Sequence, residues 1–181
     1  MKVYQPNEIE GLLVIEPKVF ADERGVFFET YSKKILKEAG LDVEFVQDNQ
    51  SSSKKGVLRG LHFQNPPYAQ GKLVRVLSGS VWDIAVDIRK SSPTYGQYYA
   101  LELNDRNNLM FYLPPGFAHG FYALEDNSVF SYKCTNYYNK ESEDGILWND
   151  PTLKINWPDN QPILSNKDKL LKYFNEFSSM F

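Results

Sequence analysis

Residues 72–88 read KLVRVLSGSVWDIAVDI, two runs rich in β-branched residues on either side of the turn pair Ser78-Gly79. The two runs predict strands over 72–77 and 81–88 joined by a tight turn. Runs of the same kind lie on both sides of this stretch and predict further strands over 57–64, 97–103, 109–113, 120–124 and 128–136. Strands at this regular spacing indicate an all-β fold, either an antiparallel sandwich or a barrel.

The N-terminal part of the chain predicts extended segments and one short helix. Residues 11–31 are broken by Pro17 and by the turn sequence DERG at 22–25. A helix over 33–39 follows, because Ser32 is a favourable N-cap and Gly40 is a favourable residue after the last turn.

A second helix is predicted near the C-terminus. Ser165 and Asp168 have the spacing of a capping box, in which the first and fourth residues satisfy each other's backbone N–H groups. Apolar residues then recur at helical spacing, namely Leu170, Leu171, Phe174 and Phe177. We expect a C-terminal helix whose apolar stripe packs on the β body.

Composition limits the class of protein. The chain has 181 residues, 42% of them hydrophobic, and no internal repeat or linker-like tract, so we expect one domain over 1–181. A net charge of −3 without a long Lys/Arg block argues against nucleic acid as a partner. The acidic N-terminal sequence does not resemble a signal peptide, no apolar run reaches the length of a membrane span, and the single cysteine, Cys134, fits a reducing compartment. We expect a cytoplasmic protein.

The chain has two histidines, His62 and His119, each in a segment rich in glycine and polar residues. A histidine on the inner face of a strand can be a general base, a metal ligand or a hydrogen-bonded core residue, and the spacing leaves these possibilities open. Arg59 falls on the opposite face from His62 on an ideal strand. Either Gly60 marks a bulge that brings both side chains to one pocket, or Arg59 serves another surface.

A metal centre is disfavoured by the number of candidate ligands. Metal sites in small β-barrels need three or four His or carboxylate ligands, commonly including two histidines two residues apart on one strand. No His-x-His sequence occurs here. A site made of His62, His119 and a carboxylate is the remaining metal-dependent alternative.

Other polar residues have a structural interpretation beside a functional one. Lys72 at the start of a strand is typically a solvated strand end, and Tyr132 would share a core face with its apolar neighbours. Asp168 suits the first turn of the predicted helix. The remaining candidates form two groups. Asp22, Arg24 and Glu29 cluster around one predicted turn, and Gln47 and Asn49 lie two residues apart on one face of an extended segment.

Taken together, these segments resemble the family of nucleotide-sugar 3,5-epimerases typified by dTDP-4-dehydrorhamnose 3,5-epimerase, a metal-independent cupin. The matching stretches run in order along almost the whole chain, at 17–29, 45–49, 57–64, 70–74, 83–89, 115–121, 132–138, 146–151 and 164–168. The resemblance implies a cupin jelly-roll β-sandwich, a homodimer, no cofactor or metal, and an isomerase of nucleotide sugars that serves lipopolysaccharide or capsule polysaccharide biosynthesis.

The resemblance also implies a role for each matching residue. It makes His62 the general base and Tyr132 the general acid, with Asp168 paired to the base. It places Lys72 beside the reacting carbonyl and makes Tyr138 the aromatic residue on which the nucleobase stacks. The substrate contacts that it implies are Arg24, Glu29, Gln47, Asn49, Arg59, His119, Glu143 and Lys167.

The implied chemistry suits these residue types. C3 and C5 of the sugar both adjoin the C4 ketone, so either C–H becomes acidic once the enolate oxygen is stabilised. Inversion requires the proton to return from the opposite face, and therefore two groups must flank the ring. His62 and Tyr132 would be these groups, Lys72 would face the enolate oxygen, and Arg24 and Arg59 would bind the diphosphate.

Several alternatives stay open. The first expected substrate is dTDP-4-dehydro-6-deoxy-D-glucose, but segments 50–53, 65–68 and 141–144 lie outside the shared motifs and border the expected site. A GDP- or CDP-linked 4-keto hexose or heptose, and inversion at C3 alone or C5 alone, are therefore alternatives. A noncatalytic cupin that binds a sugar nucleotide without turning it over is the alternative from another functional class.

Overall fold

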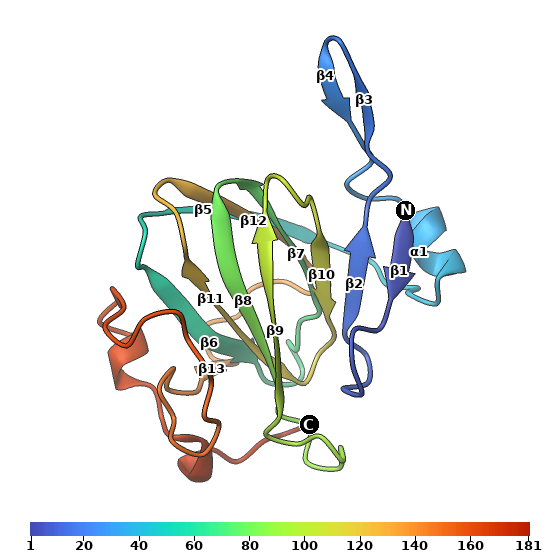
Figure 1. Ribbon diagram of the computed structural model, residues 1–181. Helices are drawn as coiled ribbons and strands as arrows, with labels where there is room; N and C mark the ends of the chain where they lie inside the picture. The colour runs from blue at the N-terminus through green and yellow to red at the C-terminus, as the bar shows by residue number, and fades with distance from the viewer.

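The structure, a computed structural model, describes residues 1–181 and is a sandwich of two β-sheets, a six-stranded and a five-stranded one, with every pair of neighbouring strands antiparallel (Figure 1). In spatial order the first sheet contains β1 (Lys2–Tyr4), β2 (Leu13–Glu16), β10 (Met110–Leu113), β7 (Lys72–Ser78), β12 (Ser128–Cys134) and β5 (Gln47–Ser53). The second contains β13 (Glu143–Gly145), β6 (Leu58–Gln64), β11 (Phe117–Ala123), β8 (Ser80–Asp87) and β9 (Tyr98–Asn104). The predicted all-β sandwich is confirmed.

The stretch at 72–88 connects the two sheets. Strand β7 belongs to the six-stranded sheet and β8 to the five-stranded sheet, and the chain crosses between them at Gly79. Gly79 has φ +81°, and a Cβ there would lie 2.6 Å from Ser128 Oγ. A side chain at this position would therefore meet both backbone strain and a steric clash.

The main core lies between the sheets, and strand β8 shows how alternation builds it. Val81 and Ala85 of β8 point into a core of 14 buried residues that also includes Phe111 and Phe130 from the other sheet. Ile84 on the opposite face joins a second buried cluster, which the C-terminal segment covers. Because the side-chain period of a strand is two, the register of β8 is fixed from both faces.

The N-terminal region follows the sequence prediction. Helix α1 (Lys33–Glu38) begins after Ser32, whose Oγ accepts a hydrogen bond from the Ile35 N–H, and Gly40 follows its end with φ +91°. The turn at 22–25 joins β3 (Phe20–Asp22) and β4 (Gly25–Phe27). This two-stranded hairpin projects away from the sandwich (Figure 1), and every residue in its two strands is exposed.

The predicted C-terminal helix is wrong. The segment contains two short 3-10 helices, η1 (Asp168–Leu170) and η2 (Phe174–Glu176), joined by extended chain. Ser165 Oγ does accept from the Asp168 N–H at 3.1 Å, but the Asp168 carboxylate bonds His62 instead of the cap. Leu170 is 84% exposed, whereas Phe174, at the start of η2, and Phe177, directly after it, reach the second core cluster.

Three strands lie outside the predicted set. The longest is β5, whose sequence QDNQSSS contains no apolar residue. It pairs with β12 along its whole length, from Gln47 opposite Cys134 to Ser53 opposite Ser128. The other two, β1 and β13, are only three residues long. Separately, no helix of the structure is long and apolar enough to cross a membrane.

Candidate active site

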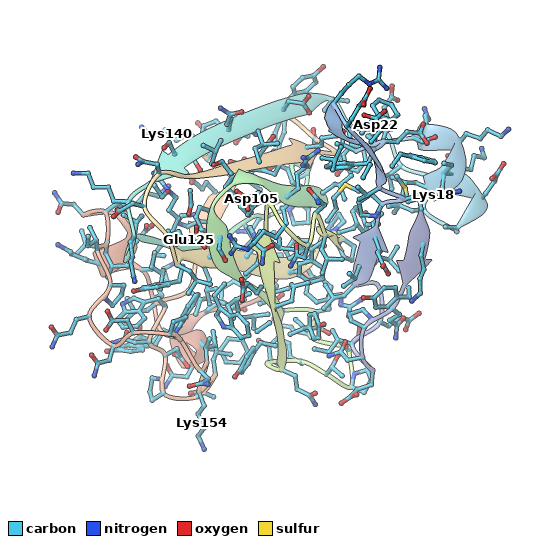
Figure 2. The ribbon with its side chains drawn as sticks, turned by 45° about the horizontal axis from the view of Figure 1, so that its top comes forward. Lys18, Asp22, Asp105, Glu125, Lys140 and Lys154 are labelled. Carbon is cyan, nitrogen blue, oxygen red and sulfur yellow. The ribbon has the colours of Figure 1, made fainter.

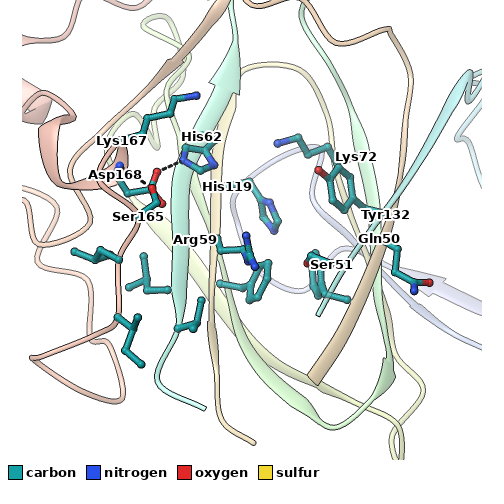
Figure 3. A pocket seen from close by; sticks show the side chains of 16 residues that line it. Gln50, Ser51, Arg59, His62, Lys72, His119, Tyr132, Ser165, Lys167 and Asp168 are labelled. Atoms are coloured by element: carbon teal, nitrogen blue, oxygen red, sulfur yellow. Dashed lines mark hydrogen bonds and ion pairs between the residues drawn. The ribbon is translucent and has the colours of Figure 1, made fainter. Parts of the chain in front are cut away.

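A cavity of about 440 Å³ opens between the two sheets (Figure 3). Its walls come from β5, β7 and β12 of one sheet, from β6 and β11 of the other, and from residues 163–168 of the C-terminal segment. A smaller hollow of about 170 Å³ shares His62, Lys72 and Tyr132 with it. The two hollows together therefore form one candidate site.

His62 and Asp168 form an ion-pair geometry at one wall of the cavity. His62 Nε2 lies 2.6 Å from Asp168 Oδ1, and the Asp168 side chain is only 4% exposed. Burial opposes the charge of Asp168, but the hydrogen bond and charge of His62 outweigh it, so the pKa of Asp168 lies below its ordinary value. The contact engages Nε2 alone, and no hydrogen bond within the protein involves Nδ1 of His62.

Tyr132 and Lys72 lie on the opposite wall from His62, as Figure 3 shows. They come from neighbouring strands, and the Lys72 Nζ lies 5.9 Å from the centre of the Tyr132 ring. Burial lowers the pKa of Lys72, while the surrounding acidic groups oppose this. Burial also raises the pKa of Tyr132, which keeps its phenol protonated. Lys72 is therefore not the solvated strand end that its position alone suggests.

His119 lies at the back of the cavity and bonds a second aspartate. Its Nε2 is 3.0 Å from both carboxylate oxygens of Asp83 on the neighbouring strand β8. Asp83 is completely buried, and burial raises its pKa although His119 and Lys72 both favour its charge. The sequence singled out His119 but not Asp83, whose only signal was a carboxylate between apolar residues in the middle of a strand.

Arg59 and His62 line the same cavity, which resolves the question that strand parity left open. The pairing of β6 with β11 shifts register between His119 and Phe121, opposite this segment. Gly60 has φ +136°, and a Cβ there would lie 2.5 Å from the Cα of Gly120. Glycine thus permits the irregularity that turns both side chains to one side.

The smaller hollow gathers most of the other predicted substrate contacts. Gln47, Asn49, Tyr138 and Glu143 line it, and Lys167 lines the adjoining main cavity. The Tyr138 hydroxyl donates to Glu143 Oε2 at 2.9 Å, and Lys167 Nζ lies 2.5 Å from the same oxygen. Burial opposes the charge of Glu143, but these two contacts outweigh it and lower its pKa. These side chains therefore offer a ligand the charged groups of Glu143 and Lys167 beside the aromatic ring of Tyr138.

Arg24 and Glu29 do not line either hollow of their own chain. The Arg24 side chain is 85% exposed and pairs with Asp22 at 2.6 Å. Figure 2 shows Asp22 on the hairpin that stands away from the sandwich. The structure thus brings together every predicted site residue except Arg24 and Glu29.

No group of three or more His, Cys, Asp or Glu side chains in the structure is arranged to hold a metal ion.

Comparison with known proteins gives close matches over nearly the whole chain. The family described as dTDP-4-dehydrorhamnose 3,5-epimerase matches residues 6–176. A dTDP-4-dehydrorhamnose 3,5-epimerase of Shigella flexneri is 56% identical over 163 residues, which cover 90% of each chain.

Solved structures agree with this match. The crystal structure of dTDP-6-deoxy-D-glucose-3,5-epimerase RmlC from Legionella pneumophila Philadelphia 1, in complex with dTDP-4-keto-L-rhamnose, has a TM-score of 0.93 and 49% identity over 98% of this chain and 94% of that chain. ChmJ, a 3'-monoepimerase from Streptomyces bikiniensis in complex with dTDP-quinovose, has a TM-score of 0.89 and 32% identity over 94% of this chain and 87% of that chain.

Proposed function

The chain belongs to the dTDP-4-dehydrorhamnose 3,5-epimerase family and is an isomerase of that class, and we propose that His62 and Tyr132 are the base and the acid of its reaction. The reaction converts dTDP-4-dehydro-6-deoxy-D-glucose into dTDP-4-dehydro-L-rhamnose by inversion at C3 and C5. The observation that carries the proposal is the placement of these two side chains on opposite walls of one cavity (Figure 3).

In the proposed mechanism, Nδ1 of His62 takes the proton from the carbon next to the C4 ketone. The electron pair of the broken C–H bond moves into the enolate, and the ammonium of Lys72 faces the enolate oxygen. The Tyr132 phenol then returns a proton to the same carbon from the other face, which inverts it. Asp168 stabilises the imidazolium that forms on His62.

We assign the remaining residues to binding. Arg59 binds the diphosphate, and His119 contacts the sugar from the back of the cavity. Tyr138 provides the face on which the base stacks, since this residue is 56% exposed. The other proposed contacts are Gln47, Asn49, Glu143 and Lys167, which adjoin it.

Incubation with the dTDP-linked 4-keto sugar in deuterium oxide tests the function. Proton NMR and mass spectrometry should show two deuteriums, at C3 and C5. A single deuterium would make the chain a one-carbon epimerase, the activity that the name of ChmJ states. Exchange only with GDP- or CDP-linked sugars would change the substrate, and exchange with none would favour a noncatalytic binding protein.

The Tyr132→Phe variant tests the assignment of the acid. Removal of the phenol proton should leave deuterium exchange at the substrate carbons, because His62 still removes and returns the proton, but it should stop inversion. A Tyr132→Phe variant that inverts the sugar at the wild-type rate would show that another group is the acid.

The exposed hairpin supports a homodimer with shared sites. Phe27 is 70% exposed and Val26 65%, although both are apolar, and Arg24 at the same tip is absent from its own cavity. We propose that the hairpin of one protomer reaches the cavity of its partner and supplies Arg24 and Glu29 there. A dimer with two-fold symmetry would make this exchange reciprocal.

Mixing two inactive variants tests the shared site. Arg24→Ala and His62→Ala chains should each lose activity, but a mixed dimer contains one site with both native residues. After subunit exchange we expect recovery to roughly a quarter of the wild-type activity, the share of intact sites under random pairing. Absence of recovery, with native mass spectrometry of differently tagged chains showing mixed dimers, would contradict the proposal.

The cellular role is the last part of the proposal. We place the protein, as one domain over 1–181, in the cytoplasm, where its buried free Cys134 stays reduced. The product would enter the synthesis of lipopolysaccharide or capsule polysaccharide. Deletion of the gene should remove rhamnose from these polymers, which sugar analysis of the cell surface can measure.

A further inference from the structure

The inner face of the polar strand β5 carries more than the predicted substrate contacts. Exposure alternates along the strand, with 48, 50 and 52 exposed and the intervening residues at least half-buried. Gln47 and Asn49 on the inner face line the smaller hollow. Because the period of a strand is two, the same face continues through Ser51 and Ser53.

Ser53 already has a partner at the end of this row. It is 4% exposed, and its Oγ accepts a hydrogen bond from Arg59 Nε at 3.1 Å. This bond crosses from the six-stranded to the five-stranded sheet and holds the proposed diphosphate-binding side chain against β5. The Arg59 guanidinium keeps further N–H groups for a ligand.

Ser51 differs from the other inner-face residues of β5 because its side chain has no hydrogen-bond partner. The Oγ is buried, yet no hydrogen bond reaches it, and Ser51 lines the main cavity. The two other buried side-chain atoms without partners belong to Asn65 and Trp82, which do not line this cavity. A buried hydroxyl without a partner is unfavourable, so a ligand oxygen at this place would gain a hydrogen bond that the protein alone does not satisfy.

The position of Ser51 defines which part of a ligand it would meet. In the pairing of β5 with β12, Asn49 lies opposite Tyr132 and Ser51 lies opposite Phe130. On the inner face of β5, Ser51 is therefore the next residue after Asn49, which lies opposite the proposed acid Tyr132. On its other side, the next inner-face residue is Ser53, which holds Arg59. The Ser51 hydroxyl lies between the groups assigned to the sugar ring and to the diphosphate (Figure 3).

We propose that Ser51 is a further substrate-binding residue, whose Oγ donates a hydrogen bond to an oxygen of the diphosphosugar between Tyr132 and Arg59. The inference rests on the proposed function, because that function places the diphosphosugar in this cavity. The oxygen belongs either to the diphosphate or to the adjoining sugar ring, and both have the same acceptor chemistry.

The test compares Ser51→Ala with Ser131→Ala. Ser131 is also half-buried and lies on the adjoining strand, but it faces the opposite side of the sheet and forms no side-chain hydrogen bond. We expect Ser51→Ala to raise KM for the 4-keto sugar about three- to tenfold, the range of one neutral hydrogen bond. Ser131→Ala should match the wild type.

Two further measurements separate binding from a structural role. Thermal unfolding should give Ser51→Ala a Tm equal to or above that of the wild type, since the substitution removes an unsatisfied group. Calorimetric titration with dTDP assigns the oxygen: a weaker Kd for dTDP indicates the diphosphate, and an unchanged Kd with a raised KM indicates the sugar.

Two outcomes would overturn the inference. One is a Ser51→Ala variant that equals Ser131→Ala in both KM and dTDP affinity, and the other is a raised KM explained by a lowered Tm. Wild-type protein that neither binds dTDP nor turns over the sugar would instead overturn the proposed function, and the two failures are therefore distinguishable.

Discussion

Both histidines of the chain bond an aspartate through Nε2, but the two pairs differ in their surroundings. The His62 side chain is 30% exposed, and its ring bonds one oxygen of Asp168 at 2.6 Å. This contact joins strand β6 to the C-terminal segment. His119 is 8% exposed and bonds both oxygens of Asp83, which lies on the next strand of the same sheet.

The charge balance of the two pairs differs as well. The pKa of Asp168 is lowered, because its bonds to His62 outweigh burial, whereas burial dominates at Asp83 and raises its pKa. A pair with a stable carboxylate and an accessible imidazole can take up and release a proton at the ring. The buried pair is instead suited to hold one side chain in place. Exposure therefore suits the same two residue types to different functions.

The strongest test of this comparison removes the accessible base. His62→Ala should lower kcat by about 10²- to 10⁴-fold, the contribution of a positioned general base. It should also abolish deuterium exchange at the substrate, because the other candidate base on that wall, Asp168, has a side chain that is only 4% exposed. Circular dichroism should show an intact fold. Retained exchange would mean that the base is elsewhere.

Matched Asp→Asn substitutions then separate the two pairs. Asp168→Asn should lower kcat about 10- to 100-fold, because the imidazolium loses its supporting charge while the base remains. As the pH falls through the lowered pKa of Asp168, the wild type loses the stability that this carboxylate contributes in the folded state. Below the ordinary Asp pKa, the Tm of the variant should therefore fall less with decreasing pH than the Tm of the wild type.

Asp83→Asn should have the opposite profile. The amide would leave a buried donor or acceptor unpaired beside His119, so we expect a loss of about 1–3 kcal/mol in the free energy of unfolding. Urea denaturation measures this loss. KM should rise only a few-fold as His119 loses its fixed orientation. A fall in kcat as large as that of Asp168→Asn would show that both pairs act on the proton.

The smallest expected effect concerns pH, and it extends the comparison to Lys72 beside Asp83. Burial lowers the pKa of Lys72, so its ammonium loses its proton below the ordinary lysine value of about 10.4. The rate should fall as pH rises through that lowered pKa, while Tyr132, whose pKa is raised, stays protonated. In Lys72→Arg the guanidinium stays charged, so this alkaline limb should disappear. A limb at the same pH in both proteins would exclude Lys72 as its cause.

The sequence alone predicts the parts of the fold in which apolar residues alternate. Strands such as β7 and β8 follow from this pattern, and the Ser32 cap with Gly40 defines helix α1. The pattern does not detect β5, because an edge strand that faces a polar cavity has no apolar side to reveal it. The polar side chains of β5 thus line the site and, for the same reason, give no apolar pattern from which the strand could be predicted.

The predicted C-terminal helix fails for a related reason. Asp168 has the right spacing for a cap, but its carboxylate forms a stronger charged bond to His62. Helical spacing of apolar residues also assumes one buried face, and the exposure of Leu170 breaks that assumption. The local helix propensity of this segment was overridden by a tertiary contact between two residues that are 106 positions apart in the chain.

The contact between His62 and Asp168, 106 residues apart in the chain, makes the candidate site depend on the C-terminal segment. The last sheet strand, β13, ends at Gly145, so a chain that stops between Gly145 and Ser165 would contain every strand of both sheets. It would still lack the partner of His62 and the C-terminal wall of the cavity. A chain shortened at this point would therefore expose the apolar surface that Phe174 and Phe177 cover and would lack a complete site, so one segment supports both stability and activity.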